Sequence, residues 1–342
     1  MAERFVIALD AMGGDHAPTS VVSGAEMALG RYENVHFLFF GDSAKIEPLF
    51  RQHPKVGLHS EIIHTDVVIQ PDDKPSVALR RGGNSSMRLA IDAVKEGKAD
   101  CVVSGGNTGA LMAMAKIVFR TLPGISRPAI AALLPTIKDD CAVLDLGANI
   151  ECNARDLVQF AIMGDAFART TLGLAKPKIG LLNVGSEEMK GHDEIKEAFN
   201  ILRNNDLGID FYGFVEGDDI TGGKVDVVVT DGFTGNIALK TAEGTGRMIG
   251  HYLRRAFESS LRTKLGYLLA KPAIDNLKQL LDPRSRNGAM FLGLNGIAVK
   301  SHGGTDGYGY YHALCVAIDL VANKINQKIL EELKQSNLPE MK

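Results

Sequence analysis

The feature that most constrains the fold is a regular alternation between short apolar runs and segments with helical periodicity. The apolar runs are rich in Val, Ile and Phe and end at glycine-containing turns, which predicts buried strands. Strands that alternate with helices favour a largely parallel sheet joined by crossover helices. The predicted strands are 5–9, 35–40, 62–69, 101–104, 129–134, 142–146, 179–184, 210–214, 225–230 and 296–300. The predicted helices include 19–31, 85–96, 109–122, 154–171, 187–205 and 235–257.

Length, charge and cysteine spacing narrow the class of protein. The 342 residues suffice for one large α/β domain, and no linker-like segment divides them, so we treat 1–342 as a single domain. A net charge of −3 gives no general attraction for nucleic acid. The four cysteines show no C-x-x-C spacing, which is typical of reduced thiols in the cytoplasm. No apolar run is long enough for a signal peptide or a membrane-spanning helix.

The first predicted strand ends in the motif DAMGGDHAP, residues 10–18. Its adjacent glycines, Gly13 and Gly14, let the backbone approach a ligand closely. Two acids, Asp10 and Asp15, and one histidine, His16, crowd the same turn. In an open α/β sheet, ligands bind at the carboxyl ends of the strands. The turn is therefore a candidate ligand site; the alternative is a structural turn in which Asp15 caps the next helix.

Residues 97–109 resemble residues 223–235, with eight of thirteen positions identical. Both segments are predicted to form a strand, a glycine- and threonine-containing loop and the start of a helix. A helix N-terminus attracts anions, and the loops add the polar side chains of Asn107, Thr108, Thr234 and Asn236. We expect the two loops to face one crevice and to bind an anion. The alternative for each loop is a capped turn; neither contains a Walker A or dinucleotide motif.

Three further turns place polar residues after predicted strands or before helices: 84–86, 145–149 and 183–187. A sheet edge that serves only the core has no need for so many polar groups, so we expect these turns to line the same crevice. The candidate substrate- and phosphate-binding residues are Asp10, Gly13, Gly14, Asp15, Ser85, Ser86, Gly106, Thr108, Gly109, Asn149, Asn183, Gly185, Lys190, Asp231, Gly232, Gly235 and Asn236.

Signatures of covalent or metal catalysis are weak in this sequence. There is no G-x-S-x-G elbow, and no cysteine lies in a recognisable catalytic context. No His/Cys pair has the spacing of zinc ligands. Asp10 and Asp15 could hold Mg²⁺, but two carboxylates in a turn are more often caps. We therefore expect neither a metal nor a cofactor.

A basic amphipathic segment spans residues 247–271 and is predicted to be helical, with a break at Gly266 or Pro272. Its pattern suits an anionic membrane surface or an acidic partner protein. The alternative is a solvated helix packed on the core or on a subunit interface. The residues expected to contact membrane or carrier protein are Arg247, Arg254, Arg255, Arg262, Lys264, Leu265 and Leu268.

Seven motifs in order give the chain a close resemblance to the bacterial phosphate acyltransferases, or acyl-carrier-protein:phosphate transacylases, of phospholipid synthesis. They are DAMGGDHAP, NSSM, SGGNTGALM, LDLGAN, GLLNVGSEE, TDGFTGN and KSHGGTD. Departures are mild: Thr305 stands where relatives often have Ser, and Gly82 and Gly83 stand where many have a basic residue. A phosphate role for Arg80 or Arg81 is correspondingly less secure.

The resemblance implies a three-layer α/β/α fold like that of isopropylmalate dehydrogenase and phosphotransacetylase, with a helical hairpin at about 245–275 linked to membrane contact. It also implies transfer of a long-chain acyl group from acyl carrier protein to inorganic phosphate. The expected protein is a homodimer in the cytoplasm, peripherally associated with the inner face of the cell membrane.

Phosphate is already a competent nucleophile, so the reaction needs positioning and oxyanion stabilisation more than an acid–base triad. We expect Asn107, Thr108, Thr234, Gly235 and Asn236 to hold phosphate or the oxyanion, with His16 or His302 protonating the departing sulfur. The candidate catalytic residues are thus His16, Asn107, Thr234 and His302.

Three alternatives have different requirements. A short-chain phosphotransacetylase would use coenzyme A and need an adenine pocket. A non-catalytic membrane-associated scaffold for lipid synthesis would have no use for polar strand-end loops. A nicotinamide-dependent dehydrogenase is disfavoured because the dinucleotide motif is missing.

Overall fold

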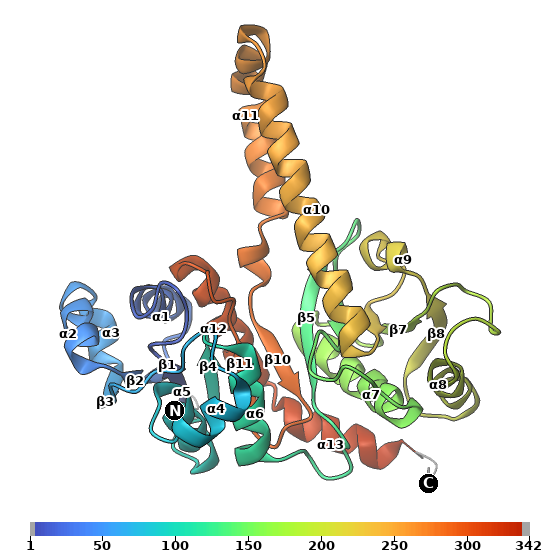
Figure 1. The fold of residues 1–342 in the computed structure, drawn as a ribbon, viewed down its shortest axis with the longest axis horizontal. Helices are drawn as coiled ribbons and strands as arrows, with labels where there is room; N and C mark the ends of the chain where they lie inside the picture. The colour runs from blue at the N-terminus through green and yellow to red at the C-terminus, as the bar shows by residue number, and fades with distance from the viewer. Residues whose placement is uncertain (1–3, 337–342) are drawn as a thin grey trace.

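The computed structural model describes residues 4–336 and contains one sheet of eleven strands in the order β3-β2-β1-β4-β11-β10-β5-β6-β9-β7-β8 (Figure 1). The strands are β1 (Phe5–Asp10), β2 (Val35–Gly41), β3 (Ser60–His64), β4 (Cys101–Ser104), β5 (Ala129–Pro135), β6 (Asp140–Leu144), β7 (Lys178–Leu182), β8 (Asp210–Val215), β9 (Val227–Val229), β10 (Ala289–Leu292) and β11 (Ile297–Lys300).

Helices connect most of these strands. They are α1 (Thr19–Arg31), α2 (Ser43–Gln52), α3 (Pro54–Leu58), α4 (Pro75–Arg81), α5 (Ser86–Lys95), α6 (Thr108–Phe119), α7 (Ala154–Thr171), α8 (Asp193–Asn204), α9 (Gly217–Gly222), α10 (Gly232–Glu258), α11 (Leu261–Leu280), α12 (Gly307–Ala322) and α13 (Ile325–Gln335), with a 3₁₀ turn at Pro283–Arg286.

The two ends of the sheet run in opposite directions. From β3 to β11 all neighbours are parallel, and from β6 to β8 they are parallel again. Between these groups lie three antiparallel steps, β11 with β10, β10 with β5 and β5 with β6. An odd number of reversals means that the carboxyl ends of β1, β4 and β11 lie at one edge of the sheet. The carboxyl ends of β6, β9 and β7 lie at the opposite edge.

The sheet separates two apolar layers because successive side chains of a strand point to opposite faces. Along β1, Ile7 and Leu9 join the layer formed with α1, α7, α8, α12 and α13. Ala8 joins the layer formed with α4, α5, α6 and the first turns of α10. The strands at the middle of the sheet are buried on both faces, so the fold has three layers, α/β/α.

Side-chain caps fix where several helices begin. Ser85, Asn107, Asp231 and Asp306 each accept a hydrogen bond from a backbone N–H in the first turn of α5, α6, α10 and α12, respectively. Such caps satisfy donors that have no partner within the helix. Because the helices follow strands closely, capping also holds the intervening loops at the sheet edge.

Helices α10 and α11 form a hairpin that projects from the body of the molecule (Figure 1). The chain reverses at Ser259 and Ser260, and the Ser260 hydroxyl caps α11 by accepting a hydrogen bond from the backbone N–H of Thr263. The predicted break at Gly266 or Pro272 is therefore wrong, because both residues lie inside α11. No helix in the described part of the chain is long and apolar enough to cross a membrane.

The predicted fold class, including the protruding hairpin, is confirmed, and ten of the eleven strands overlap predicted runs. The predicted strand 62–69 is too long, because β3 ends at His64 and Thr65 turns the chain by donating its hydroxyl to the carbonyl of Asn84. The helix expected from residue 187 begins at Asp193, after a turn at Glu187–Lys190. Strand β10 was not predicted.

A pair of matched substitutions tests the central position of β10. Phe291 is fully buried, whereas Phe233 is 60% exposed. Replacing Phe291 by Ala leaves a cavity in a close-packed layer and is expected to lower the free energy of unfolding by about 3–5 kcal/mol. Urea denaturation measures this loss. Phe233→Ala should change stability by less than about 1 kcal/mol, and equal losses in both variants would contradict the described core.

Candidate functional site

The ends of β1, β4 and β11 meet at a pocket of about 500 Å³. In the sheet register, Ser104 at the end of β4 lies between Asp10 of β1 and Lys300 of β11. The pocket is lined by Met12, Gly14, Asp15, Val68, Ile69, Gln70, Pro71, Gly105, Gly106, Asn107, Thr108, Gly109, Lys300 and Gly303. Four separate chain segments therefore build one concave surface.

Asp10 organises the floor beneath this pocket. Its side chain is buried and accepts hydrogen bonds of 2.6 Å from the hydroxyls of both Ser86 and Ser104. The Ser104 hydroxyl oxygen in turn accepts a 3.0 Å bond from the backbone N–H of Gly106. Burial raises the pKa of Asp10, and the two serine hydrogen bonds oppose this rise. Asp10, which was predicted for the site together with Ser86, thus connects Ser86 to Ser104, and Ser104 in turn holds the backbone of Gly106 in the glycine loop.

Glycines allow three loops to touch through their backbones. A Cβ atom at Gly105 would lie 2.7 Å from the carbonyl oxygen of Gly13, and Gly14 has a positive φ of 114°. The backbone N–H of Asp15 donates to the carbonyl of Gly303 at 2.9 Å. Any side chain at Gly105 would push these loops apart. The predicted close approach of the backbone at residues 13 and 14 is therefore made to a neighbouring loop.

Lys300 places its amine at this pocket. Its Nζ donates hydrogen bonds to the carbonyls of Gly105, at 3.2 Å, and Ser301. Burial lowers the pKa of Lys300 to about 8; the charge of Lys240 acts in the same direction, while the nearby acids Asp10 and Asp15 oppose it. Lys300 belongs to the KSHGGTD motif but is not among the site residues predicted from the sequence. The strand position directly before a glycine turn was the signal that could have found it.

Asn107 begins α6 and ties a second loop to it. Its Oδ1 accepts a hydrogen bond from the backbone N–H of Ala110, and its Nδ2 donates to the carbonyls of Pro71 and Asp73 at 2.8 and 3.0 Å. Both side-chain N–H bonds are therefore used in holding the loop at 71–73. The role expected of Asn107 in holding phosphate stays a prediction; the contacts observed are those of a cap and an anchor.

The predicted loop at 230–235 lies at the other edge of the sheet. There Asp145 accepts hydrogen bonds from the backbone of Ile130, Gly147, Ala148 and Asn149 and from the Asn149 side chain. Thr234 donates its hydroxyl to Asp231, the cap of α10. The remaining predicted residues at this edge are Asn183, Gly185, Lys190, Gly232, Gly235 and Asn236.

The expectation that the two similar loops face one crevice is wrong. Strands β4 and β9 run in opposite directions, so the loops that follow them leave the sheet at opposite edges. The sequence similarity reflects equivalent places in the sheet: β4 lies between β1 and β11, and β9 lies between β7 and β6. The predicted site residues thus divide into two sets, and those that line the pocket all belong to the set at the ends of β1 and β4.

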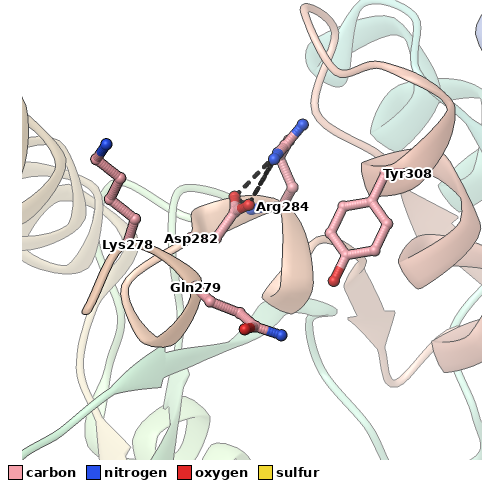
Figure 2. Close-up of a pocket in the computed structure, with 5 residues that line it drawn as sticks. All are labelled: Lys278, Gln279, Asp282, Arg284 and Tyr308. Atoms are coloured by element: carbon pink, nitrogen blue, oxygen red, sulfur yellow. Dashed lines mark hydrogen bonds and ion pairs between the residues drawn. The ribbon is translucent and has the colours of Figure 1, made fainter. Parts of the chain in front are cut away.

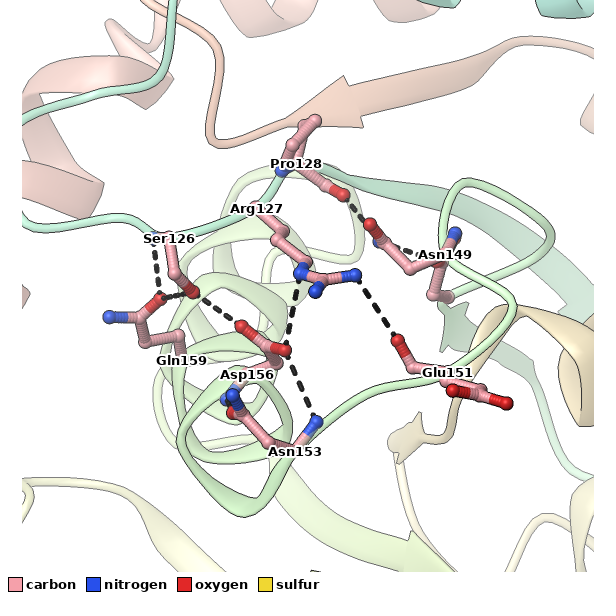
Figure 3. A network of polar contacts seen from close by, with 9 residues as sticks. Ser126, Arg127, Pro128, Asn149, Glu151, Asn153, Asp156 and Gln159 are labelled. Carbon is pink, nitrogen blue, oxygen red and sulfur yellow. Dashed lines mark hydrogen bonds and ion pairs between the residues drawn. The ribbon is translucent and has the colours of Figure 1, made fainter. Parts of the chain in front are cut away.

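A polar network continues from the second edge (Figure 3). Asn149 donates to the carbonyl of Pro128, and Arg127 next to it contacts Asp156, whose carboxylate also accepts from Ser126. Gln159 bonds both the N–H and the hydroxyl of Ser126. Each of these groups has a partner within the network. We infer that this network anchors the start of β5 on α7.

The histidines expected to move protons are both exposed. His16 and His302 belong to loops that border the pocket, but neither side chain lines it. His302 accepts a hydrogen bond from the backbone N–H of Gly304 at 3.2 Å. Within residues 4–336, no three His, Cys, Asp or Glu side chains come together closely enough to hold a metal ion.

A second, smaller pocket of about 360 Å³ lies where the hairpin joins the body (Figure 2). Arg284 forms ion pairs with Asp282, at 2.7 Å, and with Asp306, at 2.6 Å, and its guanidinium lies over the ring of Tyr308. The charges of Arg284 and Asp282 are thus already paired. The contacts of Arg284 with Asp306 and Tyr308 tie the base of the hairpin to the start of α12.

Comparison with known proteins gives both a family and a fold. The family model described as "Fatty acid synthesis protein" matches residues 5–328. A phosphate acyltransferase of Rhodospirillum centenum is 60% identical over 97% of this chain and 94% of its own. Another, of Paramagnetospirillum magneticum, is 56% identical over 97% of this chain and 95% of its own.

Solved structures of low sequence identity share the fold. A phosphotransacetylase from Streptococcus pyogenes has a TM-score of 0.65 at 18% identity, covering 94% of this chain and 95% of its own. A branched-chain phosphotransacylase from Enterococcus faecalis V583 has a TM-score of 0.58 at 16% identity, covering 93% and 99%. These likenesses confirm the predicted phosphotransacetylase-like fold.

The burial of Lys300 has a consequence for stability as a function of pH. Its folded-state pKa of about 8 is below the ordinary 10.5, so between these values the unfolded chain binds more protons than the folded chain. Stability from this group therefore rises with pH across that window. Between pH 8 and pH 10, wild type should gain on the order of 1–3 kcal/mol relative to Lys300→Met. Urea denaturation at both pH values measures the difference; parallel curves would contradict a buried amine.

Proposed function

The chain belongs to the fatty acid synthesis protein family, whose members named above are phosphate acyltransferases, and on this premise we propose that its pocket is where an acyl group is transferred to inorganic phosphate. The observation that carries the proposal is the convergence of three anion-binding features on one pocket. These are the N-terminus of α6, the glycine backbone of the 105–106 loop and the amine of Lys300.

Each of these features suits a tetrahedral anion. The first N–H groups of α6 that are not used by the Asn107 cap have no partner within the helix, and the helix dipole favours negative charge there. Gly106 and Gly109 present backbone without a side chain in the way. Lys300 supplies one positive charge in a partly water-excluded place, where its attraction is stronger than in bulk water.

We propose that the acyl donor is a long-chain thioester of acyl carrier protein and that the product is an acyl-phosphate for phospholipid synthesis. The pocket lining also includes the apolar side chains of Met12, Val68, Ile69 and Pro71, against which an acyl chain can lie. The projecting hairpin carries arginines and lysines that suit an acidic carrier. His16 and His302 remain candidates for contacts with the donor, because their loops border the pocket.

We further propose that the hairpin makes peripheral contact with an anionic membrane from the cytoplasmic side. Leucines 261, 265, 268 and 269 on α11 are 61–85% exposed, and Arg262 and Lys264 lie among them. Exposed apolar side chains flanked by basic residues favour a membrane interface. Pairing of the exposed hairpins of two chains would also cover apolar surface, which is consistent with the homodimer that we propose.

The donor and acceptor can be tested together. Incubating the purified chain with long-chain acyl-[acyl-carrier-protein] and phosphate should release free carrier and form acyl-phosphate at a rate that saturates with phosphate. We expect kcat/KM with acyl-coenzyme A of the same chain length to be at least about tenfold lower, a difference of roughly 1.4 kcal/mol. The proposed reaction would be contradicted if acyl-[acyl-carrier-protein] stayed intact, or if it disappeared at a rate that does not depend on phosphate. Preference for a short-chain coenzyme A ester would favour the phosphotransacetylase alternative.

The place of the reaction can be tested with two glycine substitutions. Gly105→Ala puts a methyl group within 2.7 Å of the Gly13 carbonyl and should disturb the pocket, lowering kcat/KM at least about tenfold. Gly83→Ala places its methyl group in open space and is the matched control. Near-normal activity of folded Gly105→Ala would exclude this pocket as the phosphate site.

The hairpin prediction has its own assay. Sedimentation with phosphatidylglycerol liposomes should retain wild type, while Leu265→Glu, Leu268→Glu should bind at least about tenfold more weakly, because two apolar contacts are lost and two negative charges are added. The control is Leu58→Glu, Ile137→Glu, which changes exposed apolar residues outside α10 and α11. If the hairpin variant sediments like wild type, the membrane contact lies elsewhere. If only acyl-carrier-protein turnover falls, the hairpin binds the carrier.

A further inference from the structure

The pocket holds two charged side chains, Lys300 and Asp15, among its lining residues in the described range 4–336. The carboxylate of Asp15 is exposed, whereas the amine of Lys300 is held between the carbonyls of Gly105 and Ser301. An ammonium group has three N–H bonds. Two of them are used by these carbonyls, so one remains for a bound molecule.

Acyl transfer from a thioester to phosphate must move one proton. In HPO₄²⁻, an unprotonated oxygen attacks the carbonyl carbon and forms the new C–O bond, and the C–S bond then breaks with its electron pair going to sulfur. The phosphate hydroxyl loses its proton in forming the acyl-phosphate dianion, and the thiolate gains one to become a thiol. Atoms and charge balance without any further reactant, provided that a group carries the proton between the two sites.

We propose that Lys300 is a catalytic residue that carries this proton: its ammonium protonates the departing sulfur, and the resulting amine takes the proton from the phosphate hydroxyl. This assignment rests on the proposed function of the pocket. It gives Lys300 two roles at one place, attraction of the phosphate and return of its proton. No additional acid or base is required.

The surroundings of Lys300 suit an amine that changes its protonation state. Burial lowers its pKa to about 8, close to the ordinary value of a thiol, so that proton exchange is nearly balanced. The groups that face it are Asp10 from β1, Asp15 from the following turn and Lys240 from α10. The two acids favour the ammonium and Lys240 favours the amine. Asp10 is a positioning group here, because the serines already satisfy its carboxylate oxygens.

Two substitutions separate charge from proton transfer. Lys300→Arg keeps a positive charge but does not release a proton near neutral pH. It should leave the KM for phosphate within about threefold while kcat falls at least about 100-fold, the range of a lost general acid–base group. Lys300→Met should lose kcat similarly and also raise the KM for phosphate. Lys116→Met, at an exposed position of α6, is the matched control and should behave as wild type.

The wild-type pH profile is a second readout that needs no variant. At a fixed concentration of HPO₄²⁻, kcat/KM should fall as pH rises above about 8, where the ammonium is lost. Lys300→Arg should show no such fall. Retention of kcat in Lys300→Arg, or a wild-type profile that stays flat to pH 10, would overturn the proposal. If wild type shows no phosphate-dependent transfer at all, the proposed function fails first, which separates the two outcomes.

Discussion

The buried carboxylate of Asp10 is the interaction on which the pocket depends. It receives the hydroxyl of Ser86 from the start of α5 and the hydroxyl of Ser104 from the end of β4, so one side chain links three chain segments. A buried carboxylate without such partners would be costly. Because Ser104 also accepts from the backbone N–H of Gly106, the same network fixes the loop that opens α6. The pocket is thus shaped from beneath by hydrogen bonds that are shielded from water.

The antiparallel middle of the sheet decides which polar loops work together. Strand β10 is antiparallel to both β11 and β5, and β5 is antiparallel to β6, so these three reversals leave the two parallel groups pointing in opposite directions. Asp145 and Asn149 at the far edge form a network that resembles the one around Asp10 in its use of a buried carboxylate at a strand end. The similar loops of the chain are therefore equivalent in architecture and separate in space.

Local signals in the sequence are sufficient to predict most helices and strands, but they do not predict the direction of each strand in the sheet. The caps Asn107 and Asp231 and the runs of β1 and β4 follow short-range rules, and their segments were predicted closely. Strand β10 has four residues, after a 3₁₀ turn, and gives no periodic signal of its own. The expectation of a parallel sheet puts the ends of all strands at one edge and Thr234 beside Asn107, whereas the antiparallel pairings of β10 and of β5 with β6 separate the two loops. Lys300 was overlooked for a related reason, because its burial depends on β11 lying next to β4.

Hydrogen bonds and an ion pair join the base of the hairpin to the pocket and form one frame. Asn287, just after the hairpin, donates to the Ser301 hydroxyl and the Gly309 carbonyl and accepts from the backbone N–H of His302, each at 2.8 Å. Arg284 adds an ion pair to Asp306, the cap of α12. The segment 300–306, which carries Lys300 and Gly303 into the pocket, is therefore held at both ends by residues at the base of the hairpin. Since Asp10 fixes the pocket from beneath and this frame fixes it from the side, the amine of Lys300 stays in place although its burial disfavours the charge.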